Sequence, residues 1–120
     1  MSGERDLDRL LADLKPELSP QRYCFETTDR PELTGDTFAL IREAEGVTAI
    51  RESPDGEWAR ISLGVQSSLQ AVGLTAALSN AMAERRLSAN IVAALHHDHI
   101  FVQWERREEA LAVIRGISKA

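Results

Sequence analysis

The stretch that decides the fold is Trp58-Ala59-Arg60-Ile61-Ser62-Leu63-Gly64-Val65. Every second residue in it is apolar, which places four apolar side chains on one side of an extended chain: Ala59, Ile61, Leu63 and Val65. The residues between them, starting with Trp58 and Arg60, fall on the other side. Alternation with a period of two is typical of a β-strand with one buried face. We therefore predict a half-buried strand over residues 58–65.

Toward the C-terminus, the sequence predicts a helix, two strands and a final helix. Residues 72–86 are rich in alanine and carry large apolar residues at a spacing of four, which favours a helix. Residues 89–95 and 99–104 are predicted strands, and the three residues between them are few enough to force an antiparallel hairpin. An apolar stripe over residues 110–117 predicts the final helix. Strand, helix, strand, strand, helix is the ferredoxin-like order without its last strand.

Toward the N-terminus, the first predicted element is an amphipathic helix. Residues 6–14 carry leucines at helical spacing, and Pro16 ends this helix because a proline disfavours helical backbone in the residue before it. The pair Ser19-Pro20 predicts a turn. Residues 21–28 then alternate between two faces, as expected of a strand.

Between this strand and residue 58, the sequence predicts a loop, a short helix, a further strand and a turn. Residues 38–44 carry an apolar stripe at helical spacing, closed by Gly46 at the position that follows a helix end. Residues 47–52 are a predicted strand. The sequence Ser53-Pro54-Asp55-Gly56 is a β-turn, with proline and glycine in favoured positions. No linker rich in Gly, Ser or Pro follows it.

These elements predict an α+β protein with a ferredoxin-like (βαββαβ) fold, antiparallel sheets and helices packed on one face. An N-terminal half covers residues 1–57 and includes the leading helix, and a C-terminal half covers residues 58–120. We expect a strand of the first half to complete the sheet of the second. The halves are therefore predicted to be intertwined rather than separable.

Composition limits the classes of function. The 120 residues are 43% hydrophobic and 28% charged, as in an ordinary globular domain, and no apolar run approaches the roughly 20 residues needed to span a bilayer. A net charge of −5 with no basic stretch longer than a pair argues against nucleic-acid binding. The start, Met1 to Asp6, has mixed charge and no apolar signal core, which predicts a cytoplasmic protein. The single cysteine, Cys24, excludes an internal disulfide and is predicted to be buried and inert.

Several segments resemble an ACT domain. They are residues 67–78, 87–92 and 97–102. More narrowly, the chain is similar to small stand-alone bacterial ACT proteins, whose architecture is related to the paired ACT modules of aspartate kinases. The resemblance is strongest over residues 60–117, and residues 42–48 extend it into the first half.

The resemblance implies a fold that binds a small metabolite, commonly an amino acid, at an interface between ACT units. Family members place the ligand against the loop after the first strand and the start of the first helix. The matching positions run from Gln66 to Leu74, and the candidates among them are Gln66, Ser67, Ser68, Leu69, Val72, Gly73 and Leu74. The family usually has a proline where this chain has Val72.

Physical chemistry gives the same segment a rationale. Free backbone N–H groups at a helix N-terminus attract carboxylates, Ser67 and Ser68 add hydroxyl donors, and Gly73 lets a ligand approach the backbone. The alternative is an ordinary helix N-cap with a close-packed glycine, because serine is preferred at that position in any protein.

Three polar residues farther along the chain are additional candidates. Asn90 opens an otherwise apolar strand, where it either hydrogen-bonds a ligand or caps the turn after the helix. Asp98, or a neighbouring histidine such as His97, is a candidate to bind the charged amino group of a ligand.

The cluster His96-His97-Asp98-His99 suggests a different chemistry. His97 and His99 would share one face of a continuing strand, where imidazoles can meet a divalent ion. However, no HExxH or CxxC spacing accompanies them, and such residues on a hairpin turn are more often solvated. General base catalysis would require a partner nucleophile or acid, and the sequence nominates none. We therefore predict no catalytic residues, no metal and no cofactor.

The sequence thus favours a regulatory, allosteric binding module that senses an amino acid, works as a homodimer and has no catalytic activity of its own. One alternative is a metal-binding protein or enzyme centred on residues 96–99. Another is an interaction subunit that regulates a partner protein without binding a ligand. Neither nucleic acid nor membrane is expected among its partners.

Overall fold

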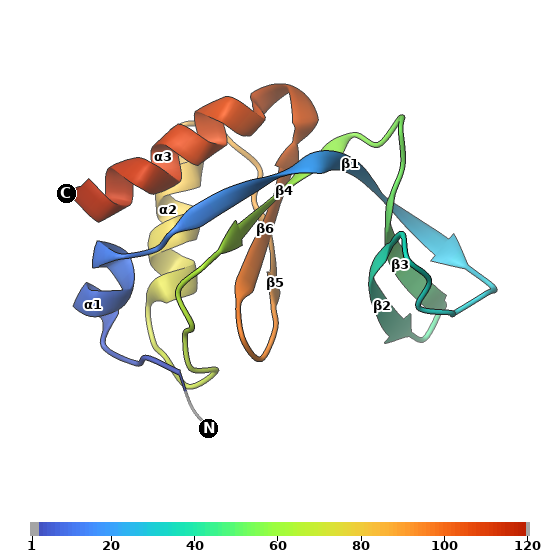
Figure 1. The fold of residues 1–120 in the computed structure, drawn as a ribbon, viewed down its shortest axis with the longest axis horizontal. Helices are drawn as coiled ribbons and strands as arrows, with labels where there is room; N and C mark the ends of the chain where they lie inside the picture. Colours follow the sequence, from blue (N-terminus) through green and yellow to red (C-terminus); the bar gives the residue numbers. More distant parts are fainter. Residues whose placement is uncertain (1–2, 120) are drawn as a thin grey trace.

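The computed structural model describes residues 3–119, so Met1, Ser2 and Ala120, at the outer ends of the two predicted halves, lie outside the described residues. Six strands, three α-helices and one short 3₁₀ helix form within residues 3–119 (Figure 1). In chain order they are α1 (Leu7–Ala12), β1 (Pro16–Thr28), β2 (Thr37–Glu43), β3 (Gly46–Glu52), β4 (Trp58–Leu63), α2 (Leu74–Glu84), β5 (Asn90–Ala93), β6 (Asp98–Gln103), the 3₁₀ helix (Trp104–Arg106) and α3 (Arg107–Lys119).

All six strands belong to one antiparallel sheet with the order β2-β3-β1-β4-β6-β5. β1 serves two neighbours, because its N-terminal part pairs with β4 and its C-terminal part, from Tyr23 to Thr28, pairs with β3. Beside β4, it supplies the fourth strand that the strand-helix-strand-strand-helix order lacks. The fold is therefore of the predicted α+β, ferredoxin-like type.

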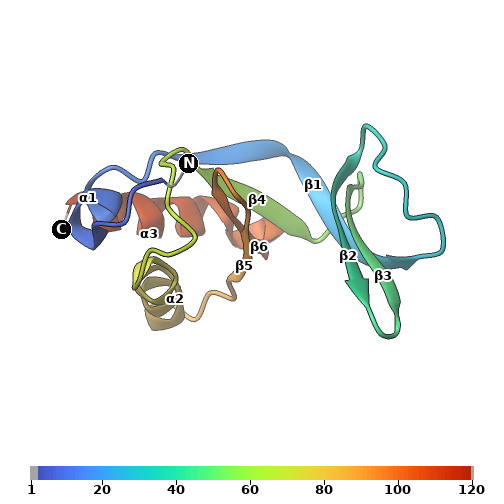
Figure 2. The same ribbon diagram turned by 90° about the horizontal axis from the view of Figure 1, so that it is seen from below.

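The main core lies between one face of the sheet and the helices. Alternate residues of β4 are fully buried there, and the same holds for Ile100 and Val102 of β6. They pack against buried residues of all three helices, including Leu10, Leu78 and Ile114. Burying one such side chain contributes about 1.5–3 kcal/mol. The helices therefore cover a single face of the sheet, and Figure 2 shows them at one end of the molecule with the β2–β3 hairpin at the other.

The other face of the sheet carries a second, aromatic cluster around Tyr23 and Phe101. The ring centroids of these two residues are 5.6 Å apart, and the rings meet edge to face. Phe38 of β2 contacts both rings in the same way, at 6.2 Å and 5.4 Å. Edge-to-face pairs add about 0.5–1.5 kcal/mol each beyond the area they bury. This cluster joins the β2–β3 hairpin to the rest of the sheet.

The predicted short helix over residues 38–44 is wrong. Residues 38–43 belong to β2 and Ala44 lies in the turn that follows. β2 pairs with β3 in a tight hairpin whose last pair joins Glu43 and Gly46. Gly46 adopts a φ of +140°, which L side chains rarely adopt, so this glycine shapes the hairpin turn instead of ending a helix. Contacts with residues distant in sequence favour the strand, because a strand places Phe38 on the aromatic face, where its ring packs against Phe101.

The predicted turn at Ser19-Pro20 is also wrong. Both residues lie inside β1, which is 13 residues long and already begins at Pro16. The pairing of β1 with β4 shifts register between Leu18 and Arg22. A proline is tolerated in a strand at such an irregularity, because no ladder hydrogen bond is then required of its nitrogen.

The remaining elements occur where they were predicted, with ends that differ by a few residues. The helix at 72–86 is confirmed as α2, the strands on either side of residue 96 as the β5–β6 hairpin, and the final helix as α3. None of the helices formed by residues 3–119 is long and apolar enough to cross a bilayer.

Candidate functional site

The loop between β4 and α2, residues 64–73, is anchored by the N-terminal segment. The backbone N–H of Glu4 donates to the carbonyl of Gln66 at 2.8 Å, and the N–H of Ser68 donates to the carbonyl of Glu4 at 2.8 Å. These two bonds form an isolated parallel bridge between Glu4 and Ser67. The loop is therefore held in place by backbone contacts that the sequence pattern did not indicate.

A pocket lies between this loop and the β5–β6 hairpin. The buried hydroxyl of Ser67 donates a 2.8 Å hydrogen bond to Oδ2 of Asp98, the first residue of β6. The pocket has a volume of about 80 Å³, and its walls are Ser67, Ser68, Leu69, Ala71, Leu74, Thr75, Ala93 and Asp98. Five of the ten residues predicted as ligand-binding thus meet around one hollow: Ser67, Ser68, Leu69, Leu74 and Asp98.

Asp98 is the charged group of this pocket. The residue is only 8% exposed, yet no basic group among the described side chains lies within 4.0 Å of its carboxylate. Its hydrogen-bond donor in the protein is the neutral hydroxyl of Ser67. A buried charge is normally paired, since removing it from water is costly. The pocket therefore offers a carboxylate suited to a cationic group.

The serines do not cap helix α2. The N-cap is Gly73, which makes no side-chain cap hydrogen bond, and the Ser68 hydroxyl accepts from the N–H of Gln70 at 3.0 Å. Gly73 is closely packed, as the alternative interpretation of this segment predicted, because a Cβ on Gly73 would lie 2.9 Å from Cδ2 of Leu7. Gly73 also has a φ of +100°. Its surroundings are thus those of a packing position between α1 and α2.

Large apolar side chains are exposed in the two loops that form the pocket. Val72 is 83% exposed and Leu69 is 65% exposed, both in the loop that precedes α2. Leu95, in the turn between β5 and β6, is 63% exposed. Exposed apolar side chains, where they lie together, form surfaces that a partner often covers.

Two of the predicted candidates lie apart from this pocket. Asn90 is exposed at the opposite end of β5 from Ala93, about 10 Å away at the usual rise of a strand. His97 is half-buried in the hairpin turn and does not line the pocket. Its Nδ1 is buried and has no hydrogen-bond partner within residues 3–119.

The histidines do not assemble a metal centre. His99 pairs its Nδ1 with the hydroxyl of Ser62 at 2.7 Å and stacks edge to face on Phe38, with ring centroids 4.8 Å apart. The rings of His96 and His97 are 6.5 Å apart. Within residues 3–119, no group of three or more His, Cys, Asp or Glu side chains is arranged to hold a metal ion.

The thiol of Cys24 is half-buried rather than buried, in β1. Burial raises the pKa of this thiol, and the adjacent Glu26 carboxylate, which accepts a hydrogen bond from the sulfur, raises it further. A thiol of raised pKa is a poor nucleophile at neutral pH, as expected of an inert cysteine.

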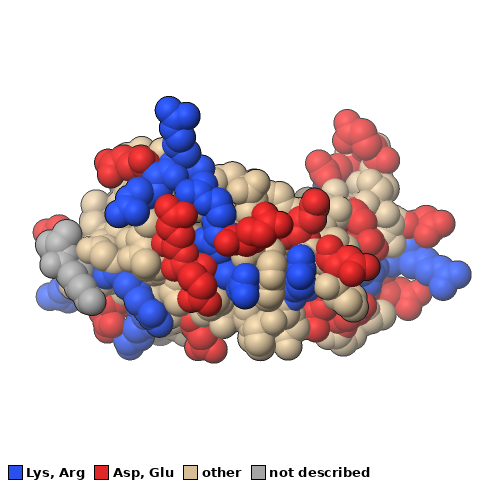
Figure 3. Space-filling model, turned by 90° about the horizontal axis from the view of Figure 1, so that it is seen from above, with Lys and Arg blue, Asp and Glu red and all other residues tan. Residues whose placement is uncertain are grey.

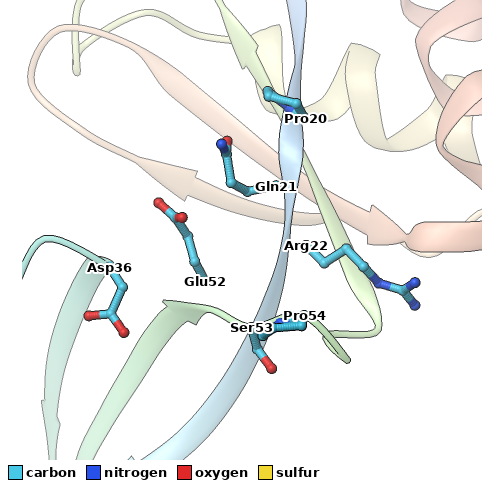
Figure 4. A pocket seen from close by; sticks show the side chains of 7 residues that line it. All are labelled: Pro20, Gln21, Arg22, Asp36, Glu52, Ser53 and Pro54. Atoms are coloured by element: carbon cyan, nitrogen blue, oxygen red, sulfur yellow. The ribbon is translucent and has the colours of Figure 1, made fainter.

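A larger and more open hollow lies between β1 and the β2–β3 hairpin (Figure 4). It has a volume of about 470 Å³, with the carboxylates of Asp36 and Glu52 on one side and Gln21 on the other. The side chain of Arg22 points away from it, and its Nε donates to the carbonyl of Gly56 at 2.7 Å. The hollow lies beside the β2–β3 hairpin, which the sequence pattern did not indicate.

Charges of both signs are mixed on one face of the molecule. The face shown in Figure 3 carries acidic and basic side chains next to one another. Such mixing is typical of a solvated surface, whereas a nucleic-acid-binding surface gathers basic residues into a patch.

The chain is thus a small α+β protein with a ferredoxin-like sheet and a pocket between a strand–helix loop and a hairpin. Two models of the ACT domain match the chain, one over residues 2–64 and the other over residues 53–116. Each match covers slightly more than half of the chain. The chain therefore belongs to the ACT domain family, whose members typically bind regulatory ligands.

Solved structures agree with this assignment. A Vibrio cholerae protein of unknown function, described as a possible transport protein, is 38% identical with a TM-score of 0.75, over 90% of this chain and 92% of that one. Aspartokinase α and β subunits (11% identity, TM-score 0.67, 91% and 100% coverage) share the fold. So does the ligand-free regulatory subunit of Thermus thermophilus aspartate kinase (12% identity, TM-score 0.65, 88% and 97% coverage). No curated protein matches the chain.

Proposed function

We propose that this protein is a non-catalytic regulatory module that senses an amino acid, and that the ligand binds between the 64–73 loop and the β5–β6 hairpin. The observation that carries the proposal is Asp98, a carboxylate that is 8% exposed in a pocket and has no cationic partner among the described residues. The α-ammonium group of an amino acid would supply the missing charge.

The chemistry of the pocket supports this choice. A charge-assisted hydrogen bond from an ammonium group to a carboxylate is about twice as strong as a neutral one. The Ser67 hydroxyl already holds Oδ2 of Asp98 at 2.8 Å, which fixes the direction in which the carboxylate faces. Fixing a binding group before the ligand arrives lowers the entropy cost of binding.

The size of the pocket supports a site that is shared between two copies of the chain. Its volume of about 80 Å³ is small beside the several hundred Å³ of a typical complete ligand site, so it takes only the head group of the ligand. Leu69 lines the pocket, and the exposed side chains of Val72 and Leu95 lie in the two loops that form it. We propose that a second copy packs on these residues and covers the rest of the ligand, in a homodimer.

We further propose that residues 1–57 and 58–120 act as two ACT-like units of one cytoplasmic protein. The two family matches, which overlap only at residues 53–64, support this division. The division does not imply two separable domains, because β1 of the first unit pairs with β4 of the second.

A thermal-shift screen with the twenty amino acids tests the proposal. A ligand present at about 100 times its dissociation constant is expected to add about 2.7 kcal/mol to the free energy of unfolding. Asp98→Asn keeps an oxygen that can accept from Ser67 but removes the charge, and we expect it to weaken binding roughly tenfold or more. Asp55→Asn, which makes the same change in the exposed β3–β4 turn, is the matched control.

The outcomes separate the proposed function from its alternatives. Binding of an amino acid that is equally tight in Asp98→Asn and in the wild type would place the ligand elsewhere. If none of the twenty amino acids raises the melting temperature, the ligand-independent interaction subunit becomes the better explanation of the exposed apolar loops.

A further inference from the structure

Arg60 lies at the centre of a hydrogen-bond network on the face of the sheet that carries no helix. Its Nε donates to the hydroxyl of Tyr23 at 3.1 Å, and its Nη1 donates to the hydroxyl of Ser62 at 2.5 Å. The guanidinium also lies over two aromatic rings, 5.4 Å from the centroid of Tyr23 and 4.8 Å from that of Phe38. These contacts fix the position of the guanidinium.

The network extends from Arg60 in both directions. Tyr23 shares a 3.2 Å hydrogen bond with Ser19, whose hydroxyl donates to Oε1 of Gln21 at 2.9 Å. On the other side, Ser62 pairs with Nδ1 of His99 at 2.7 Å. The hydroxyls of Tyr23 and Ser62 both accept a hydrogen bond from the guanidinium. Each of them therefore directs its own proton away from Arg60, toward Ser19 and His99 respectively. Nη2 of Arg60 makes no hydrogen bond to the described residues and keeps its donors free.

Arg60 carries the positive charge of this network without a counter-charge. No carboxylate among the described side chains lies within 4.0 Å of its guanidinium, although the residue is partly buried. Burial lowers the pKa of His99, and the nearby charge of Arg60 lowers it further, so His99 adds no second charge at neutral pH. A guanidinium held in place without a carboxylate is a binding group for an external anion.

A small pocket gives access to this group. It has a volume of about 140 Å³ and is lined by Glu17, Ser19, Pro20, Gln21, Arg60 and Ser62. The volume limits the ligand to a small molecule. Glu17 on the same wall disfavours a doubly charged anion, since like charges repel at short range. Pro20 and Gln21 are also walls of the larger hollow that contains Asp36 and Glu52, so the two hollows adjoin.

We infer that this pocket is a second binding site of the protein, which takes the carboxylate of a small molecule on Arg60, with Nη2 as the donor. The site is distinct from the Asp98 pocket, because it is built on the polar face of β4 and on β1. It does not depend on the proposed function. Glu17 lines the pocket, and Asp36 and Glu52 lie in the adjoining hollow. These carboxylates favour a ligand that has a cationic group beside its carboxylate, and therefore a zwitterion over a phosphate or sulfate.

The test is an NMR titration of the ¹⁵N-labelled full chain with sodium acetate, which replaces sodium chloride at constant ionic strength. Acetate is the probe because it has a carboxylate but no ammonium group for Asp98. We expect saturable shifts of the Arg60 Nε–Hε signal and of the Ser19 and Ser62 amides, with the Ser67 and Asp98 amides unmoved. Arg60→Gln should abolish the saturable shifts.

Two further variants make the result decisive. Arg42→Gln removes an exposed arginine of β2 and should leave the titration unchanged. Should Arg60→Gln lose the dispersed spectrum of a folded chain, Arg60→Lys serves in its place; it keeps the charge without the planar fork and should bind acetate roughly tenfold or more weakly.

Shifts that rise linearly without saturation, or that persist unchanged in the Arg60 variant, would overturn the assignment. Sulfate provides the last comparison. It should bind more weakly than acetate because of Glu17, and tighter binding of sulfate would contradict the choice of a carboxylate ligand.

Discussion

Asp98 and His99, which are neighbours in β6, contact different parts of the molecule. Asp98 directs its carboxylate to Ser67 and the pocket beside α2, whereas His99 contacts Ser62 and the ring of Phe38. The sequence cluster of three histidines and an aspartate is thus divided among separate environments. A strand produces this division, because successive side chains point to opposite faces of the sheet.

The lowered pKa of His99 predicts that the stability of the protein depends on pH. Burial lowers the pKa of His99, Arg60 and His97 lower it further, and Asp98 opposes them. The folded state therefore resists protonation more than the unfolded chain, whose histidines titrate near pH 6.5. We expect the free energy of unfolding to fall as the pH drops below about 6.5, until the lowered pKa of the folded state is passed. Above about pH 7.5 His99 should contribute no pH dependence.

Urea denaturation between pH 8 and pH 5.2 measures this effect. His99→Asn should show a shallower decline below pH 6.5, because the titrating group is gone. The matched change His96→Asn, at an exposed position of the hairpin turn, should keep the wild-type decline. Equal slopes in wild type and His99→Asn would show that His99 is not the group responsible.

At the scale of elements, the contact between α1 and the start of α2 depends on a glycine. Gly73 has a φ of +100°, and the side chain of Leu7 lies where a Cβ would be added. An L residue with left-handed backbone costs about 1–2 kcal/mol, and the Leu7 methyl group can move aside at lower cost. We therefore expect Gly73→Ala to reduce the free energy of unfolding by about 1–2 kcal/mol, measured by urea denaturation.

Gly116 offers the matched control for this prediction. It lies within α3, and nothing comes within 4 Å of an added Cβ. Gly116→Ala should therefore stabilise the protein by about 0.5–1 kcal/mol, since alanine favours a helix more than glycine does. If Gly73→Ala is also stabilising, the strained conformation of Gly73 is not maintained in solution.

At the scale of the whole molecule, the exposed apolar loops predict how two copies associate. Val72→Glu places a charge on a side chain that is 83% exposed, so it should leave the monomer folded but dissociate the proposed homodimer. Sedimentation velocity measures the change, and far-UV circular dichroism checks the fold. Leu33→Glu, at a residue that is 73% exposed in the loop before β2, should leave the assembly unchanged. A Val72→Glu protein that remains dimeric would place the interface elsewhere.

Much of the fold was predictable, because local patterns matched the final structure in the C-terminal half. The alternation around Ile61 was confirmed as β4, and the alanine-rich stretch before Arg85 was confirmed as α2. The N-terminal half was harder to predict. Residues 38–44 have an apolar spacing that suits a helix. As a strand, however, this segment hydrogen-bonds to β3 and packs Phe38 against the aromatic cluster. Long-range contacts override weak local preferences of this kind.

By itself, the sequence determined the elements of the C-terminal half and the ferredoxin-like order, because these follow from the spacing of neighbouring residues. The family resemblance pointed to the segment 66–74, part of which lines the pocket. Only the tertiary structure decided which polar groups meet. Ser67 and Asp98 are 31 residues apart, and Arg60 and Tyr23 are 37 apart, yet each pair is hydrogen-bonded. It also decided that Asn90 lies far from the pocket and that Gly73 packs on Leu7. The physical reason is that strand pairing and helix packing bring distant side chains together, and the periodicity of one segment does not identify the segment it will meet in the fold.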